Sequence, residues 1–84
     1  LYKSTPFMVD TGAEPNILKL RALKPDTRID KYDRLSIRSV THEKVITLGS
    51  AYLRLYGTPL KFHIVTDSFP INVDGILGST FLCN

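Results

Sequence analysis

The second half of the chain alternates between apolar and polar residues. Three runs carry this pattern, at residues 35–38, 51–56 and 60–65. Because successive side chains of a β-strand point to opposite faces, a period of two is typical of strands that bury one face. Gly57 and Pro59 interrupt the pattern between the last two runs, and both residue types supply turn geometry. The sequence therefore predicts that these two runs form a β-hairpin.

A second hairpin is predicted just upstream. Residues 35–38 and 45–48 flank the stretch Ser-Val-Thr-His-Glu-Lys at 39–44. This stretch is too polar for a core and short enough for a projecting loop. We therefore expect 39–44 to form the tip of a hairpin that stands away from the core.

The first half holds two more apolar runs, Phe7–Val9 and Ile17–Leu18, separated by residues 10–16. A strand, a tight turn and a second strand is the simplest interpretation. Near the end, residues 75–78 form a short apolar run, after which Ser79 or Thr80 could cap a helix. The pattern as a whole predicts a mainly β domain that forms a small closed barrel and has one short C-terminal helix.

Length and composition fit one small globular domain over residues 1–84, with 43% hydrophobic and 23% charged residues. A domain of this size buries about 60–65% of the surface of its unfolded chain, so a partner subunit would add stability. The single cysteine, Cys83, and two distant histidines supply neither a disulfide nor a zinc ligand set. We expect no metal and no other cofactor.

The net charge of +3 comes from Lys and Arg mixed with Asp and Glu, as at residues 28–34. Mixed signs are typical of a solvated face rather than a nucleic-acid surface. Tyr52, Arg54 and Tyr56 share one face of a predicted strand, which leaves a small nucleic-acid-binding β-barrel as an alternative. No run approaches the roughly 20 apolar residues of a membrane span, and no signal-peptide pattern begins the chain. We expect an intracellular protein.

Asp10, Thr11 and Gly12 are the strongest candidates for chemistry. Alone they are ordinary turn formers. Their context changes that interpretation, because they follow an apolar strand, precede the small Ala13 and a second strand, and are matched downstream by Ile-Leu-Gly at 76–78. Two such segments in this order are a specific pattern.

With these residues the sequence resembles the retropepsins, the aspartic proteases of retroviruses and LTR retrotransposons. Residues 7–16 and 75–82 carry the resemblance and look most like the gypsy-type retrotransposon branch. The resemblance implies a small closed barrel of the acid-protease type with a flap hairpin. It further implies an aspartic endopeptidase that matures a Gag-Pol-type polyprotein, in the cytoplasm or within virus-like particles.

The chemistry of such a site can be stated independently. Hydrolysis of an amide without metal or covalent nucleophile needs a water to be deprotonated and the amide to be protonated, which two carboxyls that share one proton can do. The chain has one such motif, so the second Asp10 must come from a symmetry-related copy. We therefore expect a homodimer whose two-fold axis passes through the active site and whose substrate is an extended peptide.

The resemblance implies roles for the neighbours of Asp10. Thr11 would bond the facing loop of the other subunit, and Gly12 would let the substrate backbone come close because it has no Cβ. These three residues would form the catalytic motif. Ala13 and Glu14 would line the substrate cleft together with Gly12.

The loop at 39–44 would be the flap that closes over the substrate, with Ser39, Val40 and Thr41 in contact with it. Many relatives carry glycines at this tip, and this chain does not. His42 is interpreted as part of a solvated loop, since no nucleophilic serine motif accompanies it.

The termini are short for a retropepsin. Only nine residues precede Asp10 and six follow Gly78, whereas retropepsins generally use longer terminal strands to join the subunits. We therefore expect a domain truncated at both ends that dimerises weakly. The alternative is a non-catalytic or domesticated retropepsin-like domain that acts as a binding or dimerisation module.

Overall fold

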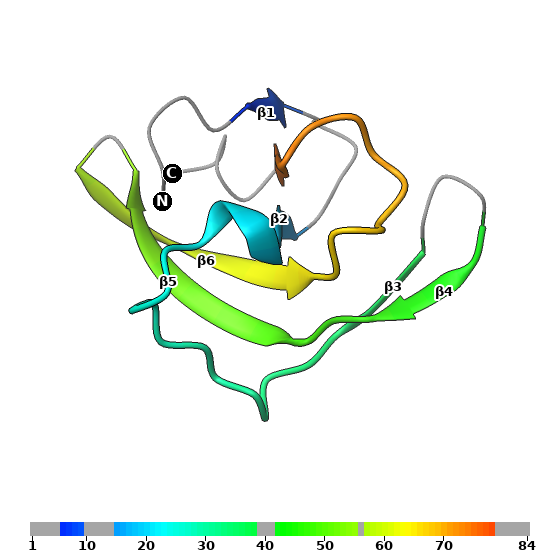
Figure 1. Cartoon of the computed structure of the whole chain (residues 1–84), viewed down its shortest axis with the longest axis horizontal. Helices are drawn as coiled ribbons and strands as arrows, with labels where there is room; N and C mark the ends of the chain where they lie inside the picture. Colours follow the sequence, from blue (N-terminus) through cyan, green and yellow to red (C-terminus); the bar gives the residue numbers. More distant parts are fainter. Residues whose placement is uncertain (1–5, 10–14, 39–41, 56, 79–84) are drawn as a thin grey trace.

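Strands dominate the computed structural model, which describes residues 6–9, 15–38, 42–55 and 57–78 (Figure 1). In order, these ranges form β1 (Phe7–Val9), β2 (Asn16–Lys19), β3 (Ser36–Arg38), β4 (Lys44–Ile46), β5 (Gly49–Leu55), β6 (Thr58–Val65) and β7 (Gly75–Leu77). A single 3-10 turn, η1 (Leu20–Ala22), follows β2. The prediction of a mainly β domain is confirmed. The predicted C-terminal helix falls on residues 79–84, which lie outside the described residues.

Both predicted hairpins are present. β5 and β6 pair in antiparallel register from Gly49↔Ile64 to Leu55↔Thr58, and Gly57 in their connection has a φ of 78°, in the left-handed region that favours glycine. β3 and β4 pair from Ser36↔Ile46 to Arg38↔Lys44. Figure 1 shows the β3–β4 hairpin and the β5–β6 connection at opposite sides of the molecule.

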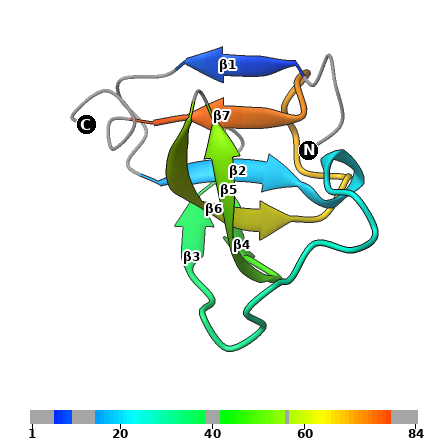
Figure 2. The same cartoon turned by 90° about the vertical axis from the view of Figure 1, so that its left-hand side faces the viewer.

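The five-stranded sheet has an order that no local pattern indicates, β1-β7-β2-β6-β5. β7 lies between β1 and β2, parallel to β1 and antiparallel to β2, while β2 runs parallel to β6 (Figure 2). The carboxyl ends of β1 and β7 and the start of β2 therefore meet at one edge of the sheet. Parallel partners require long connections, so these pairings join residues far apart in the chain.

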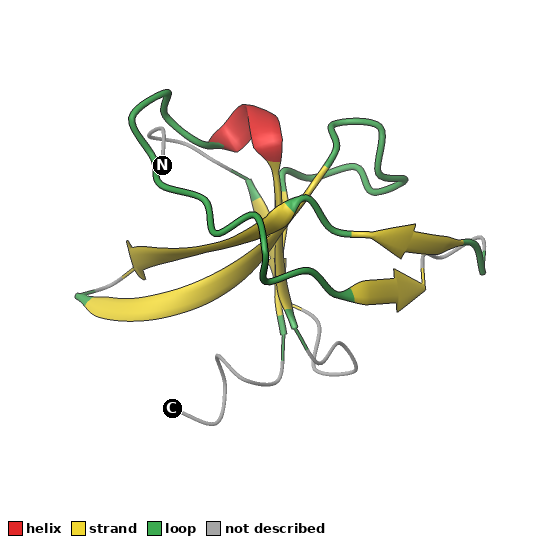
Figure 3. Cartoon of the chain, turned by 90° about the horizontal axis from the view of Figure 1, so that it is seen from below, coloured by secondary structure: helices red, strands yellow, loops and turns green. Residues whose placement is uncertain are grey.

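Both faces of this sheet carry an apolar cluster, because neighbouring residues of a strand point to opposite sides. On one face Leu18 belongs to a cluster that includes Phe62, Ile64 and Leu77, with Phe7 packed against it. The rings of Phe7 and Phe62 lie 5.9 Å apart between centroids. On the other face Ile17, Val65 and Ile76 pack with Ile37 of β3 and with Phe69. The β3–β4 hairpin is thus fixed on the second face, and Figure 3 shows it beside the main sheet.

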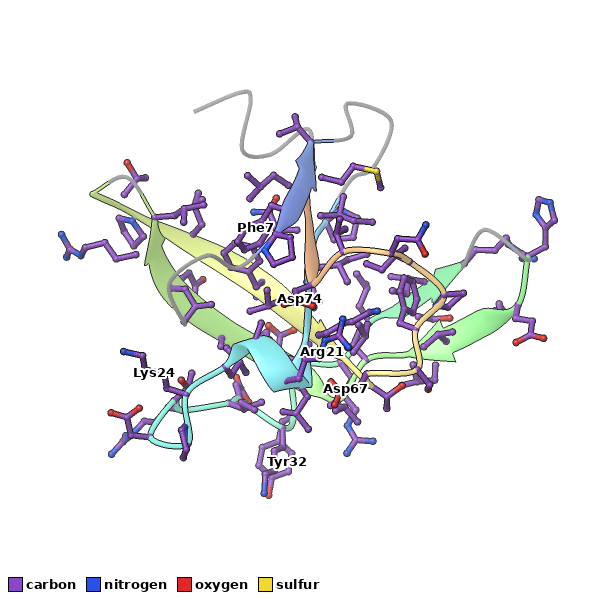
Figure 4. All side chains as sticks on the ribbon, turned by 45° about the horizontal axis from the view of Figure 1, so that its top comes forward. Phe7, Arg21, Lys24, Tyr32, Asp67 and Asp74 are labelled. Carbon is purple, nitrogen blue, oxygen red and sulfur yellow. The ribbon has the colours of Figure 1, made fainter. Side chains whose placement is uncertain are left out.

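The connection between β6 and β7 is fastened to the end of β2 and to η1. The Lys19 ammonium, on a residue only 4% exposed, donates to the Ile71 carbonyl at 2.8 Å. The Arg21 guanidinium forms an ion pair with Asp74 at 2.7 Å, and the backbone N–H of Arg21 donates to the Asp67 carboxylate at 2.8 Å (Figure 4). These contacts fix the start of β7 at the edge of the sheet opposite its carboxyl end.

The chain is as compact as expected for its length. Its radius of gyration is 11.8 Å, and a folded domain of this length typically has a value of about 12 Å. Within the described ranges, the structure contains no helix with the length and apolar content needed to cross a bilayer.

Gly75→Ala should destabilise the fold, because β7 has no room for a side chain at this position. An added Cβ would lie 2.5 Å from Cε1 of Phe7 and 2.8 Å from the Ile17 carbonyl oxygen. We expect a loss of about 1–3 kcal/mol, typical of overpacking in a core. Urea unfolding measures the loss.

A double-mutant cycle with Phe7→Ala provides the control. Since the Phe7 ring supplies the nearest contacts, the cost of Gly75→Ala should shrink when that ring is removed. Equal costs in the two backgrounds would contradict the proposed close packing of β7 against Phe7.

Candidate active site

Every residue that the sequence predicts for catalysis or substrate contact lies outside the described residues. These are Asp10, Thr11, Gly12, Ala13 and Glu14 in one segment, and Ser39, Val40 and Thr41 in the other. What the structure does define is the framework on either side of both segments.

The framework of the first segment is built by β1, β7 and β2. Val9, the residue before Asp10, pairs with Leu77 in the parallel ladder. Ile17 pairs with Ile76 in the antiparallel ladder on the other side of β7. The candidate catalytic segment therefore begins and ends on the two neighbours of β7, at the edge where Gly78 follows that strand. Ile76 and Leu77, from the apolar run that the sequence shows at 75–78, are both buried.

Asn16, the first residue of β2, links this strand to β6 and to the end of β7. Its Oδ1 accepts a hydrogen bond from the Gly78 N–H at 2.8 Å, and its Nδ2 donates to the Lys61 carbonyl at 3.2 Å. The residue is only 2% exposed. A buried amide is costly unless its polar atoms are paired, so these bonds fix Gly78 and β6 relative to the start of β2.

One row of side chains crosses the sheet on the face that the hairpin covers. Cross-strand partners share a face, and the registers align Met8, Ile76, Ile17, His63 and Ser50 from β1 to β5. The β1 end of the row is apolar and accessible, since Met8 is 42% exposed. The β5 end is polar. An apolar strip therefore borders the candidate catalytic segment.

The second framework is the β3–β4 hairpin, whose strands flank residues 39–41. The guanidinium of Arg38 donates to the His42 carbonyl at 3.1 Å across the end of the hairpin. His42 itself has a φ of 67°, an uncommon conformation for a residue with a Cβ and one typical of tight connections. The interpretation of His42 as part of the loop agrees with its exposed position.

The base of this hairpin is held by reciprocal hydrogen bonds. Leu35 N–H donates to the Thr47 hydroxyl, and Thr47 N–H donates to the Leu35 carbonyl, both at 2.9 Å. Asp30 and Ser50 exchange two backbone hydrogen bonds, of 2.8 and 3.1 Å. The segment that leads into β3 is therefore attached to β5 at Ser50 and to the β4–β5 connection at Thr47.

A polar cluster adds a third attachment. The Asp33 carboxylate accepts a hydrogen bond from the Ser50 hydroxyl at 2.7 Å and forms an ion pair with Lys61. The Lys61 ammonium and the Ser50 hydroxyl lower the pKa of Asp33, and the bond to Asp33 raises the pKa of Lys61. Burial lowers the pKa of the neighbouring His63, whose Nδ1 is buried without a partner in the described structure. Burial therefore favours the neutral form of the imidazole.

A pocket of about 520 Å³ opens beside this cluster. Its walls come from Arg28, Ile29 and Asp30, from the Asp33–Lys61 pair, and from Ser50, Ala51 and Tyr52 of β5. None of these residues belongs to a predicted catalytic or substrate-binding segment. Among the described side chains, no three His, Cys, Asp or Glu residues gather closely enough to hold a metal ion.

Sequence reasoning did not identify Asn16, Asp33 or Ser50 as structural partners. A signal was present for Asn16, because asparagine is depleted in strands and here it directly precedes two apolar strand residues. Asp33 had no such signal within its mixed-charge segment.

A comparison with known proteins found one related region. The chain is 32% identical over 80 residues to the retrovirus-related Pol polyprotein from transposon 412 of Drosophila melanogaster. The matched region covers 90% of this chain and 6% of that protein. No protein-family model and no solved structure matches the chain. The similarity supports a domain derived from a retrotransposon Pol polyprotein.

Asp33→Asn should lower stability in a pH-dependent way. The pKa of Asp33 is lower in the folded state than in the unfolded state, where it is about 4. The carboxylate therefore stabilises the fold at every pH above its unfolded-state pKa, and this contribution is lost as the pH falls through its folded-state pKa. The difference in unfolding free energy between the parent and Asp33→Asn should thus be constant near neutral pH and disappear in acid. Because both partners are partly exposed, added salt should reduce it.

Asp26→Asn, which changes an exposed carboxylate in a turn, is the matched control. Denaturant unfolding at several pH values measures all three proteins. A difference for Asp33→Asn that persists unchanged below the folded pKa would rule out the ion pair as its source.

Proposed function

We propose that the chain is an aspartic endopeptidase subunit of a retrotransposon Pol-type polyprotein and that it acts as a homodimer. The observation that carries this proposal is the junction of β1 and β7. Asp10-Thr11-Gly12 directly follows β1 in the sequence, and Gly78 directly follows its parallel partner β7. The similarity to a retrotransposon Pol polyprotein supports the same conclusion.

The reaction we propose is hydrolysis of a peptide bond by a pair of Asp10 carboxyls. One carboxylate takes a proton from a water, which attacks the carbonyl carbon, and the protonated partner donates its proton to the amide. The C–N bond then breaks, the nitrogen leaves as a protonated amine, and the carbonyl carbon becomes the new carboxyl group. Two carboxylates a few ångströms apart cannot both ionise, so they share one proton and titrate as a pair. Thr11 would orient the pair and Gly12 would admit the substrate backbone.

The substrate in this proposal is an extended polyprotein segment. In the row of Met8, Ile76 and Ile17, only Met8 is accessible, and it would contact apolar side chains of the substrate. Ile76 and Ile17 are buried core residues beside it. The β3–β4 hairpin stands over the same face of the sheet through Ile37. Residues 39–41 at its tip would close over the peptide, which is then held in the manner of an added strand.

Dimerisation would also complete the architecture. β1 and β5 are the two edge strands of the five-stranded sheet, and an uncovered edge is prone to pair with other chains. We propose that the second subunit covers these edges, and that the sheet and the hairpin together form the small closed barrel expected from the sequence.

Asp10→Asn should abolish peptidase activity while leaving the fold intact, because an amide can neither accept the water proton nor donate one in turn. Cleavage of a quenched fluorescent peptide measures the activity, and the thermal melt monitors the fold. Asp26→Asn, at an exposed turn position, serves as the matched control and should keep full activity. Activity in an Asp10→Asn preparation free of contaminating protease would refute the assignment.

Mixing the parent with Asp10→Asn tests the two-subunit site. If each site needs one Asp10 from each copy, only parent homodimers cleave, and random exchange at equal amounts leaves about one quarter of the dimers active. With total protein held constant, activity should therefore fall to about one quarter of the value for the parent alone. A fall to only one half would mean that each subunit works independently.

A further inference from the structure

The Asn16 side chain is a buried polar group whose two partners come from distant parts of the chain. It is 2% exposed, its Oδ1 accepts from the Gly78 N–H at 2.8 Å, and its Nδ2 donates to the Lys61 carbonyl at 3.2 Å. These partners are 62 and 45 residues away in sequence. A carboxamide carries both an acceptor and a donor, so one side chain satisfies both backbone groups at once.

These bonds continue the sheet where its backbone ladder stops. β7 ends at Leu77, which pairs with Val9, and its antiparallel ladder with β2 comprises Ile17↔Ile76 and Leu18↔Gly75. Gly78 is the next residue, and its N–H meets the Asn16 side chain in place of a strand partner. The Asn16 side chain therefore fixes one further residue, Gly78, beyond the last ladder pair of β7.

The place of Asn16 gives this bond a consequence for the segment that carries Asp10. That segment leaves the sheet after Val9 and rejoins it at Asn16, the first residue of β2. Val9 pairs with Leu77 and Asn16 bonds to Gly78, so the last residue of β7 and the residue after it fix the two flanks of the segment. Catalytic groups must be held to a fraction of an ångström, because a misplacement of about 1 Å can lower the rate about a hundredfold.

We propose that Asn16 is a positioning residue of the active site, which sets the separation between the two flanks of the catalytic segment through Gly78. This role rests on the proposed function, since it presumes that Asp10 performs catalysis. Asn16 does not touch the reacting atoms; it acts through the backbone at the end of β7.

Two substitutions separate positioning from bulk. Asn16→Leu keeps a similar volume and removes both hydrogen bonds. Asn16→Asp keeps an acceptor for the Gly78 N–H, but its ionised carboxylate faces the Lys61 carbonyl without a proton to donate. Protonation restores that donor, so the Asp variant should recover function in acid. Asn72→Leu and Asn72→Asp are the matched controls, because Asn72 is exposed.

The expected result for Asn16→Leu is a fall in kcat of about ten- to a hundredfold with KM changed less than about twofold. The far-ultraviolet circular dichroism and the dimer mass should match the parent. Amide exchange at Gly78, followed by NMR, should accelerate because its acceptor is gone. In the profile of activity against pH, the decline toward alkaline pH should begin at a lower pH for Asn16→Asp than for the parent. The Asn72 variants should match the parent.

Each outcome separates the two claims. A folded, dimeric Asn16→Leu with unchanged kcat, or with an equally protected Gly78 amide, would overturn the positioning role and leave the proposed function standing. A rate loss of the same size in the Asn72 variants would overturn it too. If Asn16→Leu does not fold, the pH profile of Asn16→Asp decides, and a profile identical to the parent's refutes the role. A parent without peptidase activity overturns the proposed function itself.

Discussion

The insertion of β7 between β1 and β2 is the constraint on which the rest of the structure depends. It pairs β1 with β7, the first and last of the described strands, and it places Ile76 and Leu77 on opposite faces of the sheet. β7 packs closely against its neighbours, because the Phe7 ring and the Ile17 carbonyl leave no space for a side chain at Gly75. The same insertion brings the residue before Asp10 next to the end of β7. One backbone arrangement therefore fixes the core and frames the candidate site.

A sheet with apolar clusters on both faces needs a cover for each. The long β5–β6 hairpin contributes to the first cluster through Ala51, Leu60 and Phe62, while the β3–β4 hairpin covers the second through Ile37. The smaller hairpin is attached mainly at its base, by Thr47 and by the Asp33 cluster. An element with few buried contacts and firm attachment at one end is the kind that opens locally at low cost, which suits the role proposed for it over a peptide substrate.

The sequence predicted what depends on neighbours in the chain. The two hairpins followed from a period of two and from turn residues such as Gly57, and the apolar run noted at 75–78 contains β7. The sheet order could not be predicted, because β1 pairs with β7 across more than sixty residues and parallel pairing has no local sequence signal. Asn16 and Lys19 were missed for a related reason. A polar residue in a short strand is ordinarily exposed, and only the distant carbonyls and N–H groups around it make burial possible.

The electrostatics of the hairpin base and of the proposed catalytic pair fit one range of pH. A pair of carboxyls that shares a proton works where one is neutral, and such enzymes therefore act on the acid side of neutrality. An ordinary surface carboxylate would begin to lose its charge under the same conditions. Lys61 and Ser50 lower the pKa of Asp33, so its carboxylate keeps its charge to a lower pH than a free carboxylate would. Partial burial of the neighbouring His63 lowers its pKa and favours the neutral imidazole. The ion pair at the base of the hairpin is therefore protonated less readily in acid than an unpaired carboxylate, under the conditions in which the proposed catalytic carboxyls exchange their proton.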